Sequence, residues 1–202
     1  KSIDIASKAY RWLADLKAER GHFVIGLGGG VVGDIAGFVA STYGRGMSFV
    51  QVPTTLLSMV DASIGGKTAV NLPEGKNLVG TFHQPKVVIA DVDSLRTLPT
   101  RELNSGWAEA VKHSLILDEN LFYIFENQSG DLLNLESSVL SDVIKKSISI
   151  KAGIVSQDVK ETKGIRSLLN YGHTIGHAIE STTKYTTFLH GEAVSIGMMA
   201  AA

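Results

Sequence analysis

The stretch FVIGLGGGVVGD, residues 23–34, indicates the fold class of this chain. Its first five residues are apolar and predict a short buried strand, and three glycines follow at once. Apolar residues at helical spacing then run over 31–41. Strand, glycine turn and helix make one half of a nucleotide-binding α/β unit, because glycines let the backbone approach a pyrophosphate at the helix N-terminus. A tight turn without a ligand is an equally good interpretation of the glycines alone.

The same alternation continues on both sides of this stretch. A helix is predicted over 2–20, ended by Gly21, and strands over 48–52 and 86–90, with a further helix over 54–62. Alternating strands and helices with glycine at the junctions predict a parallel, doubly wound α/β sheet.

The character of the chain changes after Pro99. Helical periodicity fills the rest of the chain with almost no strand signal, over 103–117, 119–127, 138–153, 165–182 and 190–202. We therefore expect an α/β domain over 1–98 and an all-helical domain over 99–202. Both ends of the chain lie inside helical patterns, so we expect an internal portion of a longer polypeptide, incomplete at each end.

Composition excludes several classes of protein. Of 202 residues, 44% are hydrophobic and 19% are charged, as in ordinary globular proteins. A net charge of −1 gives no electrostatic footprint for nucleic acid or an anionic membrane. The absence of cysteine excludes disulfides, thiolate catalysis and cysteine-ligated zinc. No apolar run reaches the roughly 20 residues of a membrane span, and we expect a cytoplasmic location.

Three of the six histidines fall within residues 173–190. His173 and His177 stand four residues apart, so on a helix their imidazoles share one face. With His190, which opens the motif HGE, they suit Zn²⁺ or a similar divalent cation. Each could instead be a hydrogen-bonded core histidine, and spacing leaves open which are ligands and which is an acid–base group. His22 and His83 fall in predicted loops and receive no role.

The predicted helix over 103–117 could supply an acidic ligand. Glu109, Lys112 and His113 share one of its faces at i, i+3 and i+4. Small apolar neighbours indicate that Glu109 is packed, and a buried carboxylate needs a charged partner or a metal ion. An exposed Glu–Lys pair is the simpler alternative.

Polar groups also follow the predicted strands of the first half. Thr54 and Thr55 come after the second strand, and Asp61 precedes a Gly-Gly-Lys sequence whose Lys67 could bind phosphate as a point charge. The spacing of a Walker motif is absent, so an ATPase is not indicated. Residues 74–77, Glu-Gly-Lys-Asn, predict a mobile loop that offers a cation and an amide. A surface lysine and an ordinary turn are the alternatives.

Taken together, these segments closely resemble the 3-dehydroquinate synthases of the sugar phosphate cyclase superfamily. The matches follow in order through nearly the whole chain: GGGVVGDIAGF (28–38), YGRG (43–46), PTTLL (53–57), DASIGGKT (61–68), GKNL (75–78), TLP (97–99), SGWAE (105–109), NYGHTIGH (170–177) and HGE (190–192). So many ordered matches are highly specific.

The resemblance implies a Rossmann-like NAD-binding part followed by a helical metal-binding part. It also implies a carbon–oxygen lyase of the shikimate pathway that needs NAD and one divalent metal ion, zinc or cobalt. That family converts 3-deoxy-D-arabino-heptulosonate 7-phosphate to 3-dehydroquinate and phosphate, through transient oxidation at C5, phosphate elimination, reduction and an intramolecular aldol closure. The partners implied are this phosphorylated heptulosonate and a second copy in a homodimer, with no nucleic acid and no membrane.

Carried over by position, the resemblance implies that Glu109, His173 and His190 are metal ligands and that His177 transfers protons. The implied substrate-binding residues are Lys112, Asn170, Lys67, Asn77, Arg166, Lys151 and Arg45, the last reaching the phosphate from a neighbouring subunit. The implied NAD-contacting residues are Gly30, Val31, Val32, Gly33, Asp34, Thr54, Thr55, Asp61, Lys67, Lys76, Ser94, Leu95, Arg96 and Thr97.

Other functions remain open at this point. A related sugar phosphate cyclase would share the NAD and metal sites and act on another heptulose or hexose phosphate. A metal-dependent polyol dehydrogenase, a more distant relative, would produce NADH in each turnover. The family has further sequence before and after this segment, so a truncated module that binds without turnover is the remaining alternative.

Overall fold

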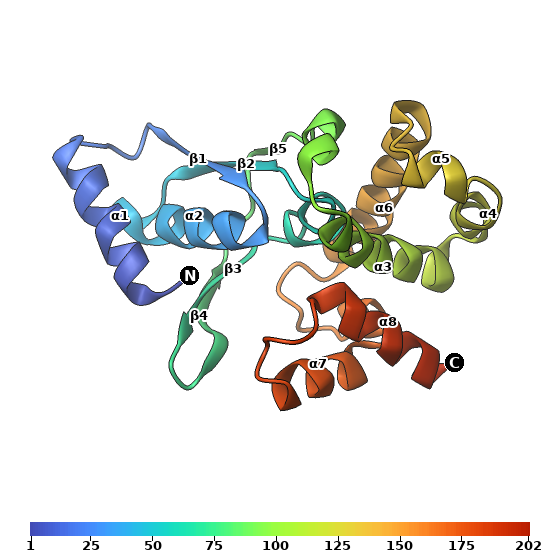
Figure 1. Cartoon of the computed structure of the whole chain (residues 1–202). Coiled ribbons are helices and arrows are strands. Elements are labelled where there is room, and N and C mark those ends of the chain that lie inside the picture. Colours follow the sequence, from blue (N-terminus) through green and yellow to red (C-terminus); the bar gives the residue numbers. More distant parts are fainter. The chain divides into compact units, whose positions relative to one another are not determined.

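A parallel sheet forms where the sequence predicts it (Figure 1). In the computed structural model, which describes residues 1–202, β2 (Ser48–Pro53) pairs in parallel with β1 (Phe23–Gly28) on one side and β5 (Val87–Val88) on the other. The strand order is β1-β2-β5, which confirms the parallel α/β prediction. The third strand keeps only two of the five residues predicted for it.

One face of this sheet is covered by α2 (Gly30–Thr42). Gly37 allows the close approach, because a Cβ atom there would lie 2.3 Å from the Thr68 side chain and 2.9 Å from Phe49. On β1, Phe23, Ile25 and Leu27 are exposed, so the prediction of a buried strand is wrong for that face. The apolar run alone cannot tell a strand buried on both faces from one buried on a single face.

The first helix ends earlier than predicted. It is α1 (Ile3–Asp15), and the Ser2 side chain accepts a hydrogen bond from its first turn. The N–H of Ala18 donates to the Leu13 carbonyl, and that of Lys17 to the Ala14 carbonyl, with Lys17 in the left-handed region at φ 52°. This is a Schellman C-cap. Gly21 is therefore not the residue that stops the helix.

An antiparallel hairpin was not predicted from the sequence. It consists of β3 (Lys67–Leu72) and β4 (Gly75–Phe82), with Val70 opposite Val79. The predicted mobile loop over 74–77 is wrong, because Lys76 and Asn77 lie within β4. A single turn of two residues joins the strands, and β-branched residues on both sides supply the cross-strand pairs.

The predicted all-helical character of the later residues is confirmed. Its α-helices are α3 (Thr100–Leu117), α4 (Glu119–Asn127), α5 (Ser129–Leu133), α6 (Ser137–Gln157), α7 (His173–Thr182) and α8 (His190–Ala201). Short helical turns occur in both halves of the chain. They are η1 (Tyr43–Arg45), η2 (Ser58–Ala62), η3 (Val92–Thr97) and η4 (Ile165–Asn170). None of the helices is long and apolar enough to cross a membrane.

The predicted helix over 165–182 is broken into η4 and α7. Gly172 stands between them with a left-handed backbone, φ 78°. A Cβ atom there would lie 2.8 Å from the Met198 backbone nitrogen and 2.9 Å from the Val194 carbonyl oxygen. The break therefore follows from the approach of α8, a tertiary contact that local periodicity does not reveal.

The chain divides into two compact units. The first comprises Lys1–Thr54 and Gly65–Asp91, and the second comprises Thr55–Ile64 and Val92–Ala202. The short segment Thr55–Ile64 thus belongs to the second unit, where η2 contacts α3 and α6. The domain boundary between residues 98 and 99 stays a prediction.

Glycines bring three helices of the second unit together. A Cβ atom on Gly191 of α8 would lie 1.9 Å from the Ser105 carbonyl oxygen of α3. The Gly191 N–H also donates to the Ser105 hydroxyl at 3.0 Å. On the other side of α8, a Cβ atom on Gly197 would lie 2.0 Å from the Gly172 carbonyl oxygen, just before α7. The start of α8 is thereby held against α3, and α8 is also held against the segment that precedes α7.

Candidate functional site

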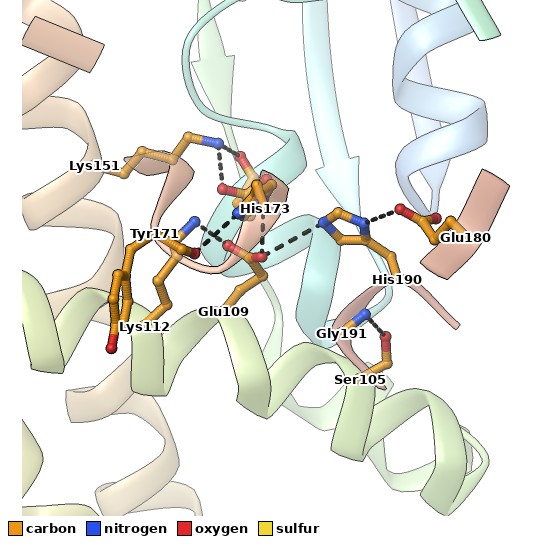
Figure 2. Close-up of polar contacts among 10 residues, drawn as sticks. Ser105, Glu109, Lys112, Lys151, Tyr171, His173, Glu180, His190 and Gly191 are labelled. Carbon is orange, nitrogen blue, oxygen red and sulfur yellow. Dashed lines mark hydrogen bonds and ion pairs between the residues drawn. The ribbon is translucent and has the colours of Figure 1, made fainter. Parts of the chain in front are cut away.

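A buried carboxylate and two imidazoles meet where α3, α7 and α8 converge (Figure 2). Glu109 is fully buried, and its Oε1 atom has no hydrogen-bond partner. The Nε2 atoms of His173 and His190 each lie 3.5 Å from that oxygen. Two zinc–ligand bonds of about 2.1 Å at a tetrahedral angle separate their donor atoms by about 3.4 Å. The spacing and the orphaned oxygen therefore fit one divalent ion.

The other nitrogen of each imidazole has a partner. His173 Nδ1 lies 3.2 Å from the Tyr171 carbonyl oxygen, and His190 Nδ1 lies 3.2 Å from Glu180 Oε2. Such contacts orient a ligating imidazole and leave its Nε2 lone pair for the metal. The structure thus brings together the three predicted ligands, and their binding of a metal stays a prediction.

The charges around the site alter the pKa values of these groups. Burial and Asp61 would raise the pKa of Glu109, but His190 and Lys112 lower it below its usual value. Burial would lower the pKa of His190, but Glu109 and Glu180 raise it to about 9. Without an ion, His190 therefore holds a proton at neutral pH, and a metal ion must displace that proton.

Three more charged side chains lie close to Glu109 and the two imidazoles. Lys112 is fully buried and donates to Glu109 Oε2, while Lys151 Nζ donates to Asp61 Oδ1 at 2.5 Å and to the Asp61 carbonyl oxygen at 2.7 Å (Figure 2). Burial alone would raise the pKa of Asp61, but Lys151 and Lys112 lower it. Two carboxylates and two ammonium groups thus balance in charge.

His113 lies among these charges and has no partner of its own. It is fully buried, and neither ring nitrogen makes a hydrogen bond within the protein. One of its nitrogens lies within 4.8 Å of carboxylate oxygens of both Asp61 and Glu109. Burial, reinforced by Lys112, lowers its pKa to about 4, so it is neutral at physiological pH.

The remaining predicted residues of the second unit differ in exposure. His177 is exposed, and its ring centroid lies 5.3 Å from that of His173 and 6.0 Å from that of His190. Arg166 is buried and donates from Nη1 to the Val159 carbonyl oxygen at 3.3 Å, whereas Asn170 is exposed at the end of η4. The structure places the His177 ring beside those of His173 and His190, as the shared helix face of His173 and His177 predicts.

Two contacts of the centre were missed by the sequence analysis. Glu180 and the Tyr171 carbonyl hold the histidines, and neither was singled out. A signal for Glu180 exists in the sequence, because His173, His177 and Glu180 follow at i, i+4 and i+7 on one helix face. The carbonyl of Tyr171 leaves no such signal.

The predicted nucleotide-binding residues of the first unit lie at the start of α2 and on the hairpin. Gly30, Val31, Val32 and Gly33 open α2 directly after β1, where backbone N–H groups are available to a phosphate. Asp34, Lys67 and Asn77 line one hollow of about 330 Å³. Lys1 forms an ion pair with Asp34 and donates to Asn77 at 2.6 Å.

The other predicted positions of the first unit are placed as follows. Thr54 donates its N–H to the Gly28 carbonyl oxygen at 3.0 Å, at the carboxyl end of β1, and Lys76 is exposed on β4. Arg45 has a left-handed backbone, φ 64°, and lines a separate hollow of about 660 Å³ together with Arg20 and Lys86.

The remaining predicted NAD contacts belong to the second unit, and one of them is Asp61, the partner of Lys151. Thr55 bonds the Ser58 hydroxyl at 2.8 Å and so helps to begin η2. The other four positions lie on η3: Ser94, Leu95, Arg96 and Thr97. Leu95 is fully buried in the core, so its side chain is not available to a ligand. The predicted NAD contacts are therefore divided between the two units.

Comparison with known families covers the whole chain. Residues 1–105 match the model of the 3-dehydroquinate synthase N-terminal region, and residues 106–202 match that of the 3-dehydroquinate synthase C-terminal region. The 3-dehydroquinate synthase of Desulforamulus reducens is 52% identical over 202 residues, which are all of this chain and 56% of the relative. That of Prochlorococcus marinus is 56% identical over 183 residues, 90% of this chain and 50% of the relative. The chain thus spans about half the length of the curated relatives it matches.

Two of the solved structures with similar folds have NAD⁺ and a divalent metal ion bound. The 2-epi-5-epi-valiolone synthase of Streptomyces hygroscopicus, with NAD⁺ and Zn²⁺ bound, superimposes with a TM-score of 0.90 at 33% identity, over 97% of this chain and 55% of that one. A 2-deoxy-scyllo-inosose synthase, complexed with carbaglucose-6-phosphate, NAD⁺ and Co²⁺, gives 0.89 at 36% identity, over 100% of this chain and 55% of that one. A glycerol dehydrogenase from Schizosaccharomyces pombe shares the fold alone. It is 17% identical and superimposes with a TM-score of 0.69, over 98% of this chain and 54% of that one.

Proposed function

Because this chain belongs to the 3-dehydroquinate synthase family, we propose that the protein containing it is an NAD- and metal-dependent carbon–oxygen lyase. It converts 3-deoxy-D-arabino-heptulosonate 7-phosphate to 3-dehydroquinate and releases phosphate. The observation that carries the proposal is the donor set of Glu109, His173 and His190, in which the buried Glu109 Oε1 faces two imidazole nitrogens at 3.5 Å.

Glu109, His173 and His190 would hold the divalent ion, zinc or cobalt. When bound, the ion would supply Lewis acidity to a substrate oxygen, and NAD⁺ would accept and return the hydride. Tyr171 and Glu180 orient the imidazoles. Because three protein ligands leave coordination positions open, substrate hydroxyls have room to bind.

The chain's own charges prepare this centre for an anionic substrate. Glu109, Lys112 and Lys151 are buried, Asp61 is partly buried, and the four cancel one another in charge. They therefore leave the positive charge of a bound cation uncompensated. His177, exposed beside the two ligand imidazoles, is the group we assign to proton transfer.

The remaining residues bind the substrate and the nucleotide in this proposal. Arg166, Asn170, Lys151, Lys112, Lys67 and Asn77 contact the heptulosonate. In a homodimer, Arg45 of one copy reaches the phosphate of the substrate that is bound to the other copy. The start of α2, Thr54, Thr55, Asp61, Lys76 and the backbone of η3 contact NAD, the glycines allowing the pyrophosphate to approach.

Turnover by the complete gene product tests the proposal. We would incubate it with the heptulosonate phosphate, a catalytic amount of NAD⁺ and Zn²⁺ or Co²⁺, and follow phosphate, 3-dehydroquinate and the absorbance of NADH. We expect equal amounts of phosphate and 3-dehydroquinate without accumulation of NADH. NADH formed in proportion to substrate would favour a dehydrogenase, and no product at all would favour a non-catalytic module.

A related cyclase is the second candidate. The high structural similarity to valiolone and inosose synthases, with TM-scores of 0.90 and 0.89, favours it. Against it, relatives that are 52% and 56% identical are 3-dehydroquinate synthases. The same assay with sedoheptulose 7-phosphate and glucose 6-phosphate separates the two, because a cyclase of another specificity would turn over one of these in preference to the heptulosonate phosphate.

A further inference from the structure

The imidazole of His190 lies between two carboxylates. Its Nε2 atom is 3.5 Å from Glu109 Oε1, and its Nδ1 atom is 3.2 Å from Glu180 Oε2. Figure 2 shows the ring with one nitrogen directed at each acid. Since the two nitrogens lie on different edges of the ring, one ion can use only one of them, and the other nitrogen stays with the remaining acid.

Two sets of potential ligands therefore share His190. The first is Glu109, His173 and His190, and the second is His177, Glu180 and His190; in each set the donor atoms lie within 4.8 Å of one another. An ion in the first set makes Glu180 an outer partner of the metal site. An ion in the second makes Glu180 a ligand and leaves Glu109 outside.

Burial and hydrogen bonding favour the first set. Glu109 is 0% exposed and its Oε1 atom has no hydrogen-bond partner, which is costly unless a cation meets it. Glu180 Oε2 already has the Nδ1 atom of His190 at hydrogen-bond distance. His177, which the second set requires, is exposed.

We propose that Glu180 is a positioning residue of the metal centre, whose carboxylate accepts the Nδ1–H of His190 and so directs the Nε2 lone pair at the ion. The inference rests on the proposed function, because it needs the metal site to exist. Glu180 lies two turns along α7 from His173 and is only 7% exposed. Both imidazole ligands thus depend on α7 or the residues just before it for their orientation, His173 through Tyr171 and His190 through Glu180.

Metal affinity of the complete gene product tests this role. We would measure the Kd of Zn²⁺ by competition with a chromophoric chelator, and record the visible absorption of the Co²⁺ form. For Glu180→Ala we expect affinity about 10–100-fold weaker, with the Co²⁺ absorption of a site that keeps its three ligands. Glu180→Gln, whose amide oxygen can still accept from Nδ1–H, should recover part of the loss.

Two controls separate positioning from general damage. Glu126→Gln removes an exposed carboxylate on α4 and should leave the Kd unchanged. Glu109→Gln removes a proposed ligand and should abolish tight binding. Circular dichroism of each variant in chelator shows whether it is folded, and the nearly isosteric Glu180→Gln keeps the test valid if Glu180→Ala does not fold.

The outcomes are distinct. Suppose that the wild-type protein binds zinc and forms 3-dehydroquinate. A Kd of Glu180→Ala within twofold of the wild-type value then overturns this inference and leaves the proposed function intact. Loss of the ion in Glu180→Gln with retention in Glu109→Gln overturns it in favour of the second ligand set. A wild-type protein that binds no divalent ion overturns both the inference and the proposed function.

Discussion

Single residues of the proposed metal site differ in their surroundings, and the differences predict different losses of metal affinity and of rate. His190 is a proposed ligand between two carboxylates, whereas His177 is exposed beside the ligand rings. For His190→Ala we expect metal affinity to fall by more than about 100-fold, beyond the loss of an outer partner. For His177→Ala we expect metal to be retained and the rate to fall by about 10²–10⁴. Metal content after dialysis and steady-state rates give the two results. Equal loss of metal from both variants would show that this division of roles is wrong.

The buried, neutral His113 predicts a pH dependence of stability. Its pKa is about 4 in the folded protein against 6.5 for the free side chain. Between these values the unfolded state binds a proton that the folded state does not, so the free energy of unfolding decreases as pH falls below 6.5. The total loss is about 3 kcal/mol once pH is below 4.

Replacing His113 by a residue that does not titrate should remove this contribution. His113→Phe keeps a planar ring and removes no hydrogen bond within the protein. Urea unfolding of both proteins at pH 7.5 and at pH 5 gives the measurement. We expect the variant to gain about 2 kcal/mol relative to wild type between the two pH values. A difference that does not change with pH would mean that His113 has the same pKa in the folded and unfolded states, so that burial does not depress it.

For these residues, the sequence indicated which side chains lie together better than it indicated the groups that contact them. The spacing of His173 and His177 predicted a shared helix face, and the resemblance implied that Glu109 joins His173 and His190. The structure brings these side chains together, and their binding of a metal stays a prediction. The role of Glu180 depends on the position of α8, which no local pattern specifies. For Leu95, the resemblance to the family implied a contact with NAD, but its side chain is buried in the core.

Among the elements, the contact of α8 with α3 controls the position of His190. Gly191→Ala would place a Cβ atom 1.9 Å from the Ser105 carbonyl oxygen, so α8 must shift away from α3. We expect a loss of about 1–3 kcal/mol in the free energy of unfolding. We also expect a metal affinity at least about 10-fold weaker, because ligand geometry tolerates only about 0.5 Å of displacement.

Gly153→Ala is the matched control for this change. Gly153 lies on α6, where a Cβ atom would have nothing within 4 Å. Alanine favours a helix over glycine by about 1 kcal/mol, so this variant should be as stable as wild type or more so, with unchanged metal affinity. If Gly191→Ala behaves like Gly153→Ala in both measurements, the contact of α8 with α3 does not determine the site.

Elements with strong periodicity were predicted well, and those that depend on distant contacts were not. The strand, glycine turn and helix around residues 23–42 lie where the sequence indicates, because local spacing specifies each of them. The hairpin of β3 and β4 was missed because its glycines and lysines are typical of loops, although the cross-strand pairs stabilise it as a sheet. The end of α1 was misplaced because Lys17, not a glycine, adopts the left-handed backbone.

For the whole molecule, the overall charge conceals the chemistry of the site. The chain carries a net charge of −1, yet its second unit places two buried lysines and the partly buried Asp61 beside the buried, predicted ligand Glu109. Composition gives only the sum of the charges, so it could not reveal a cluster whose charges cancel. The family of the chain was identified from ordered motifs, which depend on sequence alone and not on the placement of the two units.

Anomalous diffraction at the zinc edge shows directly which residues hold the ion. Crystals of the complete gene product grown with Zn²⁺ would locate the ion without any assumption about activity. We predict one strong anomalous peak per chain, bonded to a Glu109 oxygen and to the Nε2 atoms of His173 and His190, with Glu180 outside the coordination sphere. A peak bonded to His177, Glu180 and His190, or the absence of a peak at Glu109, would contradict the account.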